Sequence, residues 1–138
     1  MIKALILAVS VVATNAAFGQ GINTFAVAQE AEEVSREAYE LSQLAGQSFD
    51  LHVRELSRDA SQLAIAANRL DRAAVGICGR AFPDYLILNR VEQTCALIEQ
   101  IQSEIEAVAA ECDPRLLEIA AALSEANRGL HEASGLNE

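Results

Sequence analysis

The chain has 138 residues, with 20 acidic side chains against 10 basic ones, and a formal net charge of −10 at pH 7. Such a surface repels phosphate, which argues against binding to nucleic acid or to anionic lipid by charge attraction, because both require clustered cations. Hydrophobic residues make up 51% of the chain and aromatic residues only 4%, with no tryptophan. This composition is typical of packed helices and argues against a carbohydrate site built on aromatic platforms.

The amino terminus has the pattern of a secretory signal peptide. Lys3 precedes an apolar run over residues 4–13, and small and polar residues follow. Cleavage after Gly19 and cleavage after Ala28 both fit the small-x-small rule, and we favour the first because the second leaves a long polar stretch after the apolar run. The alternative is an uncleaved membrane anchor, but Asn15 interrupts a run already shorter than the about 20 residues that a spanning helix needs.

We therefore predict a signal peptide over residues 1–19 and one mature domain over residues 20–138, secreted or periplasmic. The 119 residues that remain after removing 19 from 138 are enough to bury a modest core. Cleavage removes Lys3 and no acid, so the net charge falls by one, from −10 to −11. We do not expect this mature domain to be a membrane protein.

Residues 20–24 contain Gly21 and Asn23 and show no periodicity, so we predict a flexible mature terminus there, followed by the first helix. Its apolar residues alternate spacings of four and three, which is a helix with one buried seam: Val27, Ala31, Val34, Ala38, Leu41 and Ala45. The seam then slips by one residue at Gly46. A turn absorbs the slip, with Gly46 ending one helix and Ser48 capping the next, or one long helix runs through it; we favour the turn.

The second predicted helix runs from Ser48 to Ile77. Leucine and alanine alternate along its seam, so a partner helix can approach closely along the small side: Phe49, Val53, Leu56, Ala60, Leu63, Ala67, Leu70, Ala74 and Ile77. We expect Gly79 to end this helix in a left-handed conformation. Phe82-Pro83 then predicts an extended step before the next helix, with Asp84 as its cap.

The third predicted helix spans Tyr85 to about Glu111, and the fourth begins at Pro114 behind an Asp113 cap and ends at Ser134-Gly135. The inward positions of both again follow heptad spacing: Ile87, Val91, Thr94 or Cys95, Ile98, Ile101, Ile105 and Val108, then Leu116, Ile119, Ala120, Leu123, Ala126, Leu130 and Ala133. The predicted fold is all-α, an antiparallel up-down bundle of three to four helices with coiled-coil-like packing.

Three cysteines, Cys78, Cys95 and Cys112, are spaced seventeen residues apart, and in an oxidising compartment they are disulfide candidates first. Within one straight helix Cys95 and Cys112 lie about 25 Å apart, whereas a disulfide needs Cα atoms within about 7 Å. The loop could instead carry Cys78 back to Cys95, closing a loop of about 17 residues and contributing about 3 kcal/mol. Cys112 is then an intermolecular thiol or a buried one, and we favour burial because it continues the apolar seam.

The two histidines, His52 and His131, raise a metal, haem or redox hypothesis. In an up-down bundle His52 would lie level with Cys112 and His131 level with Cys95. These two-ligand sets are incomplete, and the sequence holds no Cys-x-x-Cys, no His-Glu-x-x-His and no methionine after Met1. We favour solvated or partly buried histidines and predict no metal and no cofactor.

The sequence also predicts no enzyme and no catalytic residue. Residues 46–50 lack the final glycine of a nucleophile elbow, and no strand precedes them. We therefore expect a non-catalytic protein that binds another protein, or itself, through helix faces. The alternatives are a carrier of a small apolar ligand or lipid within or on the bundle, and a metal or redox role for the cysteine and histidine pairs.

Overall fold

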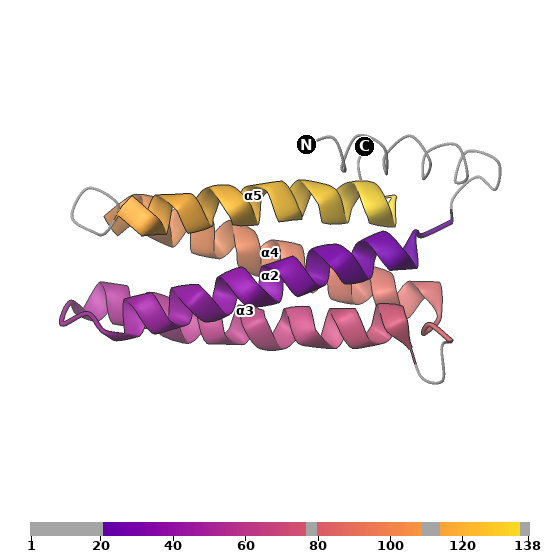
Figure 1. Cartoon of the computed structure of the whole chain (residues 1–138), viewed down its shortest axis with the longest axis horizontal. Helices are drawn as coiled ribbons and strands as arrows, with labels where there is room; N and C mark the ends of the chain where they lie inside the picture. Colours follow the sequence, from indigo (N-terminus) through magenta and orange to yellow (C-terminus); the bar gives the residue numbers. More distant parts are fainter. Residues whose placement is uncertain (1–20, 77–79, 109–113, 136–138) are drawn as a thin grey trace.

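The computed structural model describes residues 21–76, 80–108 and 114–135. These residues form four α-helices and no extended sheet, which Figure 1 shows as an elongated antiparallel bundle: α2 (Thr24–Gly46), α3 (Leu51–Val75), α4 (Asp84–Val108) and α5 (Pro114–Ser134). The predicted all-α bundle is confirmed, with four helices. Among the described helices, no stretch has both the length and the apolar character needed to span a membrane.

Each helix packs against two neighbours. Helices α2 and α4 both contact α3 and α5, whereas the described residues of α2 and α4, like those of α3 and α5, make no contact across the diagonal. The bundle is therefore a square of four helices around one core, with the α3/α4 pair forming one side and the α2/α5 pair the opposite side.

Helices α2 and α3 pack most closely, because alanines line both halves of their seam. The alanines of both seams are at most 4% exposed: Ala31, Ala38, Ala45, Ala60, Ala67 and Ala74. The small side chains let Ser57 Oγ of α3 donate a hydrogen bond of 2.8 Å to the Ser42 carbonyl of α2. Gly46 lies in the same contact, since a Cβ there would be 3.2 Å from Ser57 Oγ.

The predicted seams are buried over both of these helices, with one exception. Every predicted position from Val27 to Ala45 and from Val53 to Ala74 is at most 5% exposed. Phe49, the first predicted residue of the second seam, is instead 99% exposed, so that prediction was wrong. Phe49 lies in the turn before α3, where the backbone is not helical and heptad spacing no longer assigns a residue to a face.

Helix α2 begins earlier than its hydrophobic pattern indicates. Thr24 is its first residue, and Asn23, expected to be aperiodic, is its N-cap, with Oδ1 accepting a hydrogen bond of 3.1 Å from the Ala26 amide. The Asn23 amide also donates a bond of 2.9 Å to the Ala133 carbonyl near the end of α5. The prediction for residues 23 and 24 was wrong because a cap and a tertiary bond fix them without apolar periodicity.

The predicted turn after Gly46 is confirmed, but the cap of α3 is Asp50 and not Ser48. Asp50 Oδ1 accepts hydrogen bonds from the amides of His52 at 2.8 Å and Val53 at 3.4 Å. Ser48 Oγ accepts from the Asp50 amide at 3.0 Å and so shapes the turn that precedes the cap. Both residue types are good caps, and the carboxylate that can reach two amides takes the position.

The connection from α3 to α4 begins at a glycine in a backbone conformation that side chains avoid. Gly76 has φ 83°, and its amide donates a bond of 2.7 Å to the Arg72 carbonyl. A Cβ on Gly76 would lie 1.7 Å from the Arg80 carbonyl oxygen, so the chain folds back tightly here. Helix α3 thus ends at Val75, two residues before the predicted Ile77, and Gly76 takes the C-cap position that was predicted for Gly79. Ile77 and Gly79 themselves lie outside the described residues.

The start and end of the last helix agree with the sequence pattern. Helix α5 begins at Pro114 and ends at Ser134, followed by Gly135 with φ 79°. The predicted cap Asp113 lies outside the described residues. In α4, Thr94 and Cys95 are both buried, at 0% and 5% exposure. The hydroxyl group of the buried Thr94 donates a hydrogen bond of 2.8 Å to the Arg90 carbonyl.

Candidate functional site

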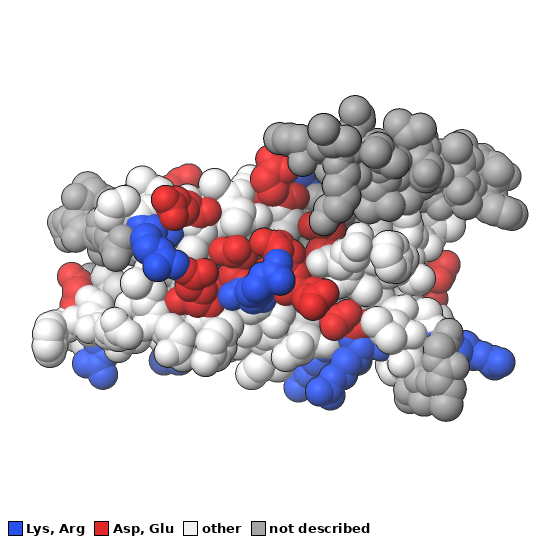
Figure 2. All heavy atoms as spheres, in the orientation of Figure 1, with Lys and Arg blue, Asp and Glu red and all other residues white. Residues whose placement is uncertain are grey.

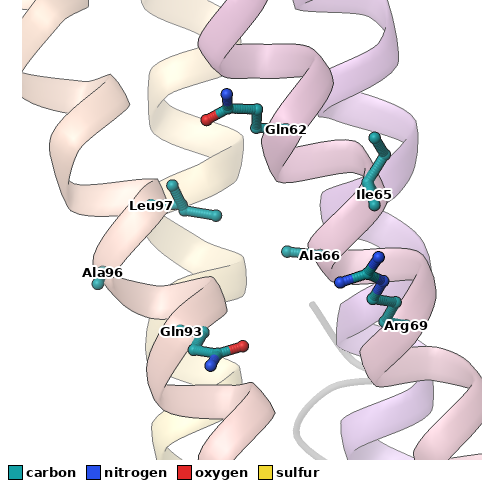
Figure 3. Close-up of a pocket in the computed structure, with 7 residues that line it drawn as sticks. All are labelled: Gln62, Ile65, Ala66, Arg69, Gln93, Ala96 and Leu97. Atoms are coloured by element: carbon teal, nitrogen blue, oxygen red, sulfur yellow. The ribbon is translucent and has the colours of Figure 1, made fainter.

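A groove of about 510 Å³ runs between α3 and α4 on the outside of the bundle. Figure 3 shows its lining, in which Ala66 and Leu97 project into the space between the two helices while Arg69 and Gln93 approach one another at one end. The apolar residues of the lining are Ile65, Ala66, Ala96 and Leu97, and the polar ones are Gln62, Arg69 and Gln93.

Each of the two helices contributes one alanine to the lining of the groove. Ala66 and Ala96 leave space that larger side chains would fill, and Ile65 beside them is 54% exposed. Leu97 packs on the core from its other side and is only partly buried. Together these side chains form an apolar surface, with Ile65 as an exposed β-branched wall. Covering this surface with a partner would be favourable, because it removes apolar area from water.

On each of the two helices, a set of residues spaced seven apart carries an acidic side chain at one end and a basic side chain at the other, and the order of the charges along the chain is opposite in α3 and α4. On α3, one heptad position carries Glu55, Gln62 and Arg69 in chain order. On the antiparallel helix α4, one heptad position carries Arg90, Leu97 and Glu104. Because the two helices run in opposite directions, the acidic members of both repeats lie toward one end of the groove and the basic members toward the other. The groove is therefore apolar in the middle and oppositely charged at its two ends.

At the acidic end, carboxylates of α3 and α4 face each other. Burial raises the pKa of Glu104 first, followed by its side-chain hydrogen bond with Asp59, and the charges of Asp59 and Glu55 add to the rise. Gln100 Nε2 opposes the shift by donating to Glu104 Oε2 at 3.2 Å, while Glu104 Oε1 is buried and accepts no hydrogen bond from the described residues. This end carries more negative charge than the described part of the chain neutralises.

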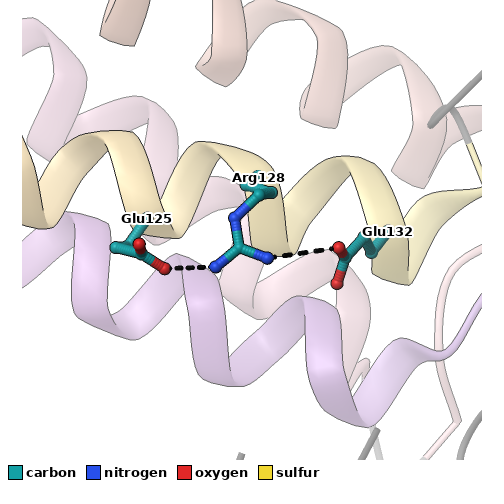
Figure 4. Close-up of polar contacts among 3 residues, drawn as sticks. All are labelled: Glu125, Arg128 and Glu132. Atoms are coloured by element: carbon teal, nitrogen blue, oxygen red, sulfur yellow. Dashed lines mark hydrogen bonds and ion pairs between the residues drawn. The ribbon is translucent and has the colours of Figure 1, made fainter.

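The opposite side of the bundle, formed by α2 and α5, is a second charged surface. Figure 2 shows carboxylates gathered over these helices with arginines among them. The arginines are paired within the chain: Arg36 with Glu33, Arg115 with Glu40, and Arg128 with both Glu125 and Glu132. The last cluster is drawn in Figure 4, where Arg128 bridges two turns of α5 and reaches Glu132 at 3.3 Å.

Glu30 is the most enclosed carboxylate of that side. Its carboxyl group lies against Gly129 of α5, so that a Cβ on Gly129 would be 2.5 Å from Glu30 Cδ. Burial is the main reason that the pKa of Glu30 is raised, and nearby Glu33 adds to the shift while Arg128 opposes it. Burial and the neighbouring Glu33 likewise raise the pKa of Glu37. In the described conformation the Glu30 carboxyl group therefore occupies the space that a Cβ at Gly129 would take.

The cysteines and histidines do not join the groove. Cys95 is a free thiol, 5% exposed, and burial followed by the charges of Glu99 and Glu92 raises its pKa to about 12. Its predicted partner Cys78 and the predicted buried or intermolecular thiol Cys112 lie outside the described residues, so the bridge stays a prediction.

His52 is exposed near the start of α3, whereas His131 is partly buried near the end of α5. Within the part of the chain that the structure describes, no three His, Cys, Asp or Glu side chains come together as a metal site. Cys112, the predicted neighbour of His52, lies outside the described residues, so the two Cys/His pairs stay predictions.

Sequence reasoning missed the groove altogether. The only signal was off the seams: Ile65 and Leu97 are apolar residues at positions that the seams leave outside, and small residues follow or precede each of them. That signal acquires meaning only when α3 and α4 are known to be neighbours. Comparison of the chain with protein-family models, curated proteins and solved structures finds no match.

Proposed function

We propose that the mature domain is a non-catalytic, secreted or periplasmic interaction module that binds protein in the groove between α3 and α4. The single observation that carries this proposal is the apolar floor of the groove, formed by Ala66, Ala96 and Leu97 and open to solvent beside the exposed Ile65. An exposed apolar surface of this kind, with polar residues at its edges, is typical of a site that a protein partner covers.

The polar groups at the groove favour recognition over chemistry. They are the amides of Gln62 and Gln93 and the guanidinium of Arg69. Amide and guanidinium groups do not act as general acids or bases near neutral pH. They can orient a partner by hydrogen bonds and, for the guanidinium group, by charge. This supports a binding role for the groove itself, without a general acid or base among its lining residues.

A photo-crosslinking experiment tests the proposal. A photoreactive phenylalanine analogue replaces Ala96 in the groove of the full chain, and in a matched strain it replaces Ala121, an exposed alanine of α5. We expect irradiation to yield a discrete protein adduct from position 96 and none from position 121. Adducts of equal yield from both positions, or no protein adduct from position 96, would contradict the proposal.

The export part of the proposal needs its own measurement. Intact-mass spectrometry of the exported protein, before and after reduction, should give the mass of residues 20–138 and a gain of two hydrogens if Cys78 and Cys95 are bridged. A full-length mass would contradict cleavage after Gly19. An unchanged mass on reduction would contradict the bridge while leaving export intact.

A second candidate function, carriage of a small apolar ligand on the bundle, is favoured by the volume of the groove. A value of about 510 Å³ lies within the range of about 300 to 1,000 Å³ typical of small-molecule pockets. Native mass spectrometry of the exported protein discriminates the two candidates, because a carrier retains an apolar adduct that the Ala96→Arg variant loses.

A further inference from the structure

We propose that the partner in the α3/α4 groove is a second copy of this chain, seated antiparallel about a two-fold axis that crosses α3 and α4 at right angles. This inference rests on the proposed function, because it names the protein that the groove binds. The axis places α3 against α3 and α4 against α4, with each pair running in opposite directions, so every contact between the copies occurs twice.

The repeat on α4 fits this symmetry. Arg90 and Glu104 each stand seven residues from Leu97, which is two helical turns or about 10.5 Å. When two α4 helices run antiparallel with Leu97 near the axis, Arg90 of each copy faces Glu104 of the other. The apolar residue then meets its own copy, and both charged ends meet the opposite charge.

The repeat on α3 has the same property in the reverse order. Glu55 and Arg69 each stand seven residues from Gln62, so an antiparallel pair of α3 helices sets Glu55 of one copy opposite Arg69 of the other. Gln62 and Leu97 both line the groove. A single axis that crosses α3 at Gln62 and α4 at Leu97 therefore relates both pairs of helices. The second repeat therefore calls for the same arrangement independently of the first.

The charges also select this axis over the other two-fold arrangement of the same faces. An axis parallel to the helices would lay α3 of one copy on α4 of the other at the same level. The acidic end, with Asp59 and Glu104, would then meet the acidic end of the second copy, and Arg69 would meet Arg90. Like charges brought together at an interface cost several kcal/mol by the general rule, so the antiparallel arrangement is the one that the groove accepts.

These four charges have no ion-pair partner within the described chain, although Glu104 accepts a hydrogen bond from Gln100. Among the described residues, none of Glu55, Arg69, Arg90 and Glu104 forms an ion pair, whereas the arginines of the α2/α5 side are paired. With Gln62 at the axis, Arg58 of one copy lies opposite Ala66 of the other and Arg72 lies opposite His52, so no two arginines of α3 lie directly opposite each other.

The size of the face suits a dimer. Helices α3 and α4 have 25 residues each, which corresponds to a length of about 37 Å. Two such helices side by side, with axes about 8 to 10 Å apart, present a face of about 700 Å². Stable interfaces bury about 600 to 1,000 Å² per partner, so the face lies near the lower end of that range and must take part over most of its length, as the antiparallel pairing allows.

Charge reversal and mixing test the inference. The variants are Arg90→Glu and Glu104→Arg, each in the full mature chain. Glu118→Arg on the exposed face of α5 is the control for the charge change of Glu104→Arg. Sedimentation equilibrium at low salt, up to about 1 mM protein, measures dimerisation, and circular dichroism checks that every variant keeps its helices.

We expect the wild-type chain and the control to dimerise, and each single reversal to weaken the dimer at least about tenfold, because it places like charges at two contacts. An equimolar mixture of the two reversals should recover wild-type affinity to within about threefold. In the mixed dimer, one variant carries carboxylates at both exchanged positions and the other carries guanidinium groups at both, so each contact again joins opposite charges.

A wild-type chain that stays monomeric, or a mixture that fails to recover, overturns the inference. If position 96 nevertheless crosslinks a different protein, the proposed function stands and only the identity of the partner is wrong. If position 96 crosslinks no protein, the proposed function has failed as well.

Discussion

Replacing Gly76 by alanine should destabilise the bundle strongly. Gly76 has φ 83° and ψ −168°, a region that residues with a Cβ avoid at a cost of about 1–3 kcal/mol. The new Cβ would also lie 1.7 Å from the Arg80 carbonyl oxygen and 2.5 Å from the Ala81 amide nitrogen. These are backbone atoms, so the connection itself must move.

The movement would also affect the next contact of the connection, in which the Phe82 amide donates a bond of 2.9 Å to the Ala73 carbonyl. Losing that bond adds about 1 kcal/mol. The expected loss for Gly76→Ala is therefore about 2–4 kcal/mol in the free energy of unfolding, or about 10 °C in the midpoint of thermal unfolding. Urea unfolding followed by far-ultraviolet circular dichroism measures it directly.

The matched control is the same substitution at Gly129, for which we expect the opposite sign. Its Cβ would approach only the carboxyl end of Glu30, at 2.5 Å, and that flexible end can turn toward solvent. Alanine is better than glycine inside a helix by about 1 kcal/mol, so Gly129→Ala should stabilise by about 0.5–1 kcal/mol. A Gly76→Ala variant within about 0.5 kcal/mol of wild type, or two variants that shift in the same direction, would refute this reasoning.

Three further predictions follow from burial and charge. Phe49→Ala should leave the free energy of unfolding within about 0.5 kcal/mol of wild type, because the ring is 99% exposed, whereas Leu63→Ala should cost about 2–5 kcal/mol in the same urea titration. Burial first, and then neighbouring carboxyls, raises the folded pKa of Glu104 above the usual 4.5, so its contribution to stability is complete below pH 4.5 and is lost as pH rises through the higher folded value. Thermal unfolding should therefore occur at higher temperature at mildly acidic pH than at neutral pH, and Glu104→Gln should reduce that difference; an unchanged pH profile would contradict it. In the reduced protein the thiol of Cys95, which is buried and has a pKa of about 12, should react with a thiol reagent only after unfolding in denaturant. Fast labelling of the native reduced protein at this residue, mapped by peptide mass, would show that the site opens.

The disulfide prediction sets a specific geometric demand. Cys95 is eleven residues after Asp84, the first residue of α4, which places it about 16 Å along that helix. The chain before α4 must carry Cys78 to that depth for a bridge to form. Peptide mapping of the non-reduced exported protein therefore tests both the pairing and the path of this connection.

Heptad spacing predicted the core well, because one physical condition, burial of a stripe along a helix, decides every position in it. The seams of α2 and α3 are buried from Val27 to Ala45 and from Val53 to Ala74. The start of α5 at Pro114 was predictable for a related reason, since proline tolerates only the first turn of a helix. Both signals depend on a short stretch of chain and need no knowledge of the neighbours.

The remaining features depend on competition or on topology. Ser48 and Asp50 are both good caps, and the difference of a few tenths of a kcal/mol between them is decided by the conformation of the turn. The charge repeats at Glu55 and Glu104 are visible in the sequence, but they become two ends of one groove only because α3 and α4 are antiparallel neighbours. A one-dimensional pattern holds no distance between helices, so it cannot predict a groove.

The hydrogen bond from the Asn23 amide to the Ala133 carbonyl fixes the start of α2 beside the end of α5. The described chain therefore begins and ends at the same end of the bundle. In two copies paired antiparallel along the α3/α4 side, these ends point away from each other. Such a dimer would hold the segments attached to its two copies at opposite ends of the assembly, and not side by side.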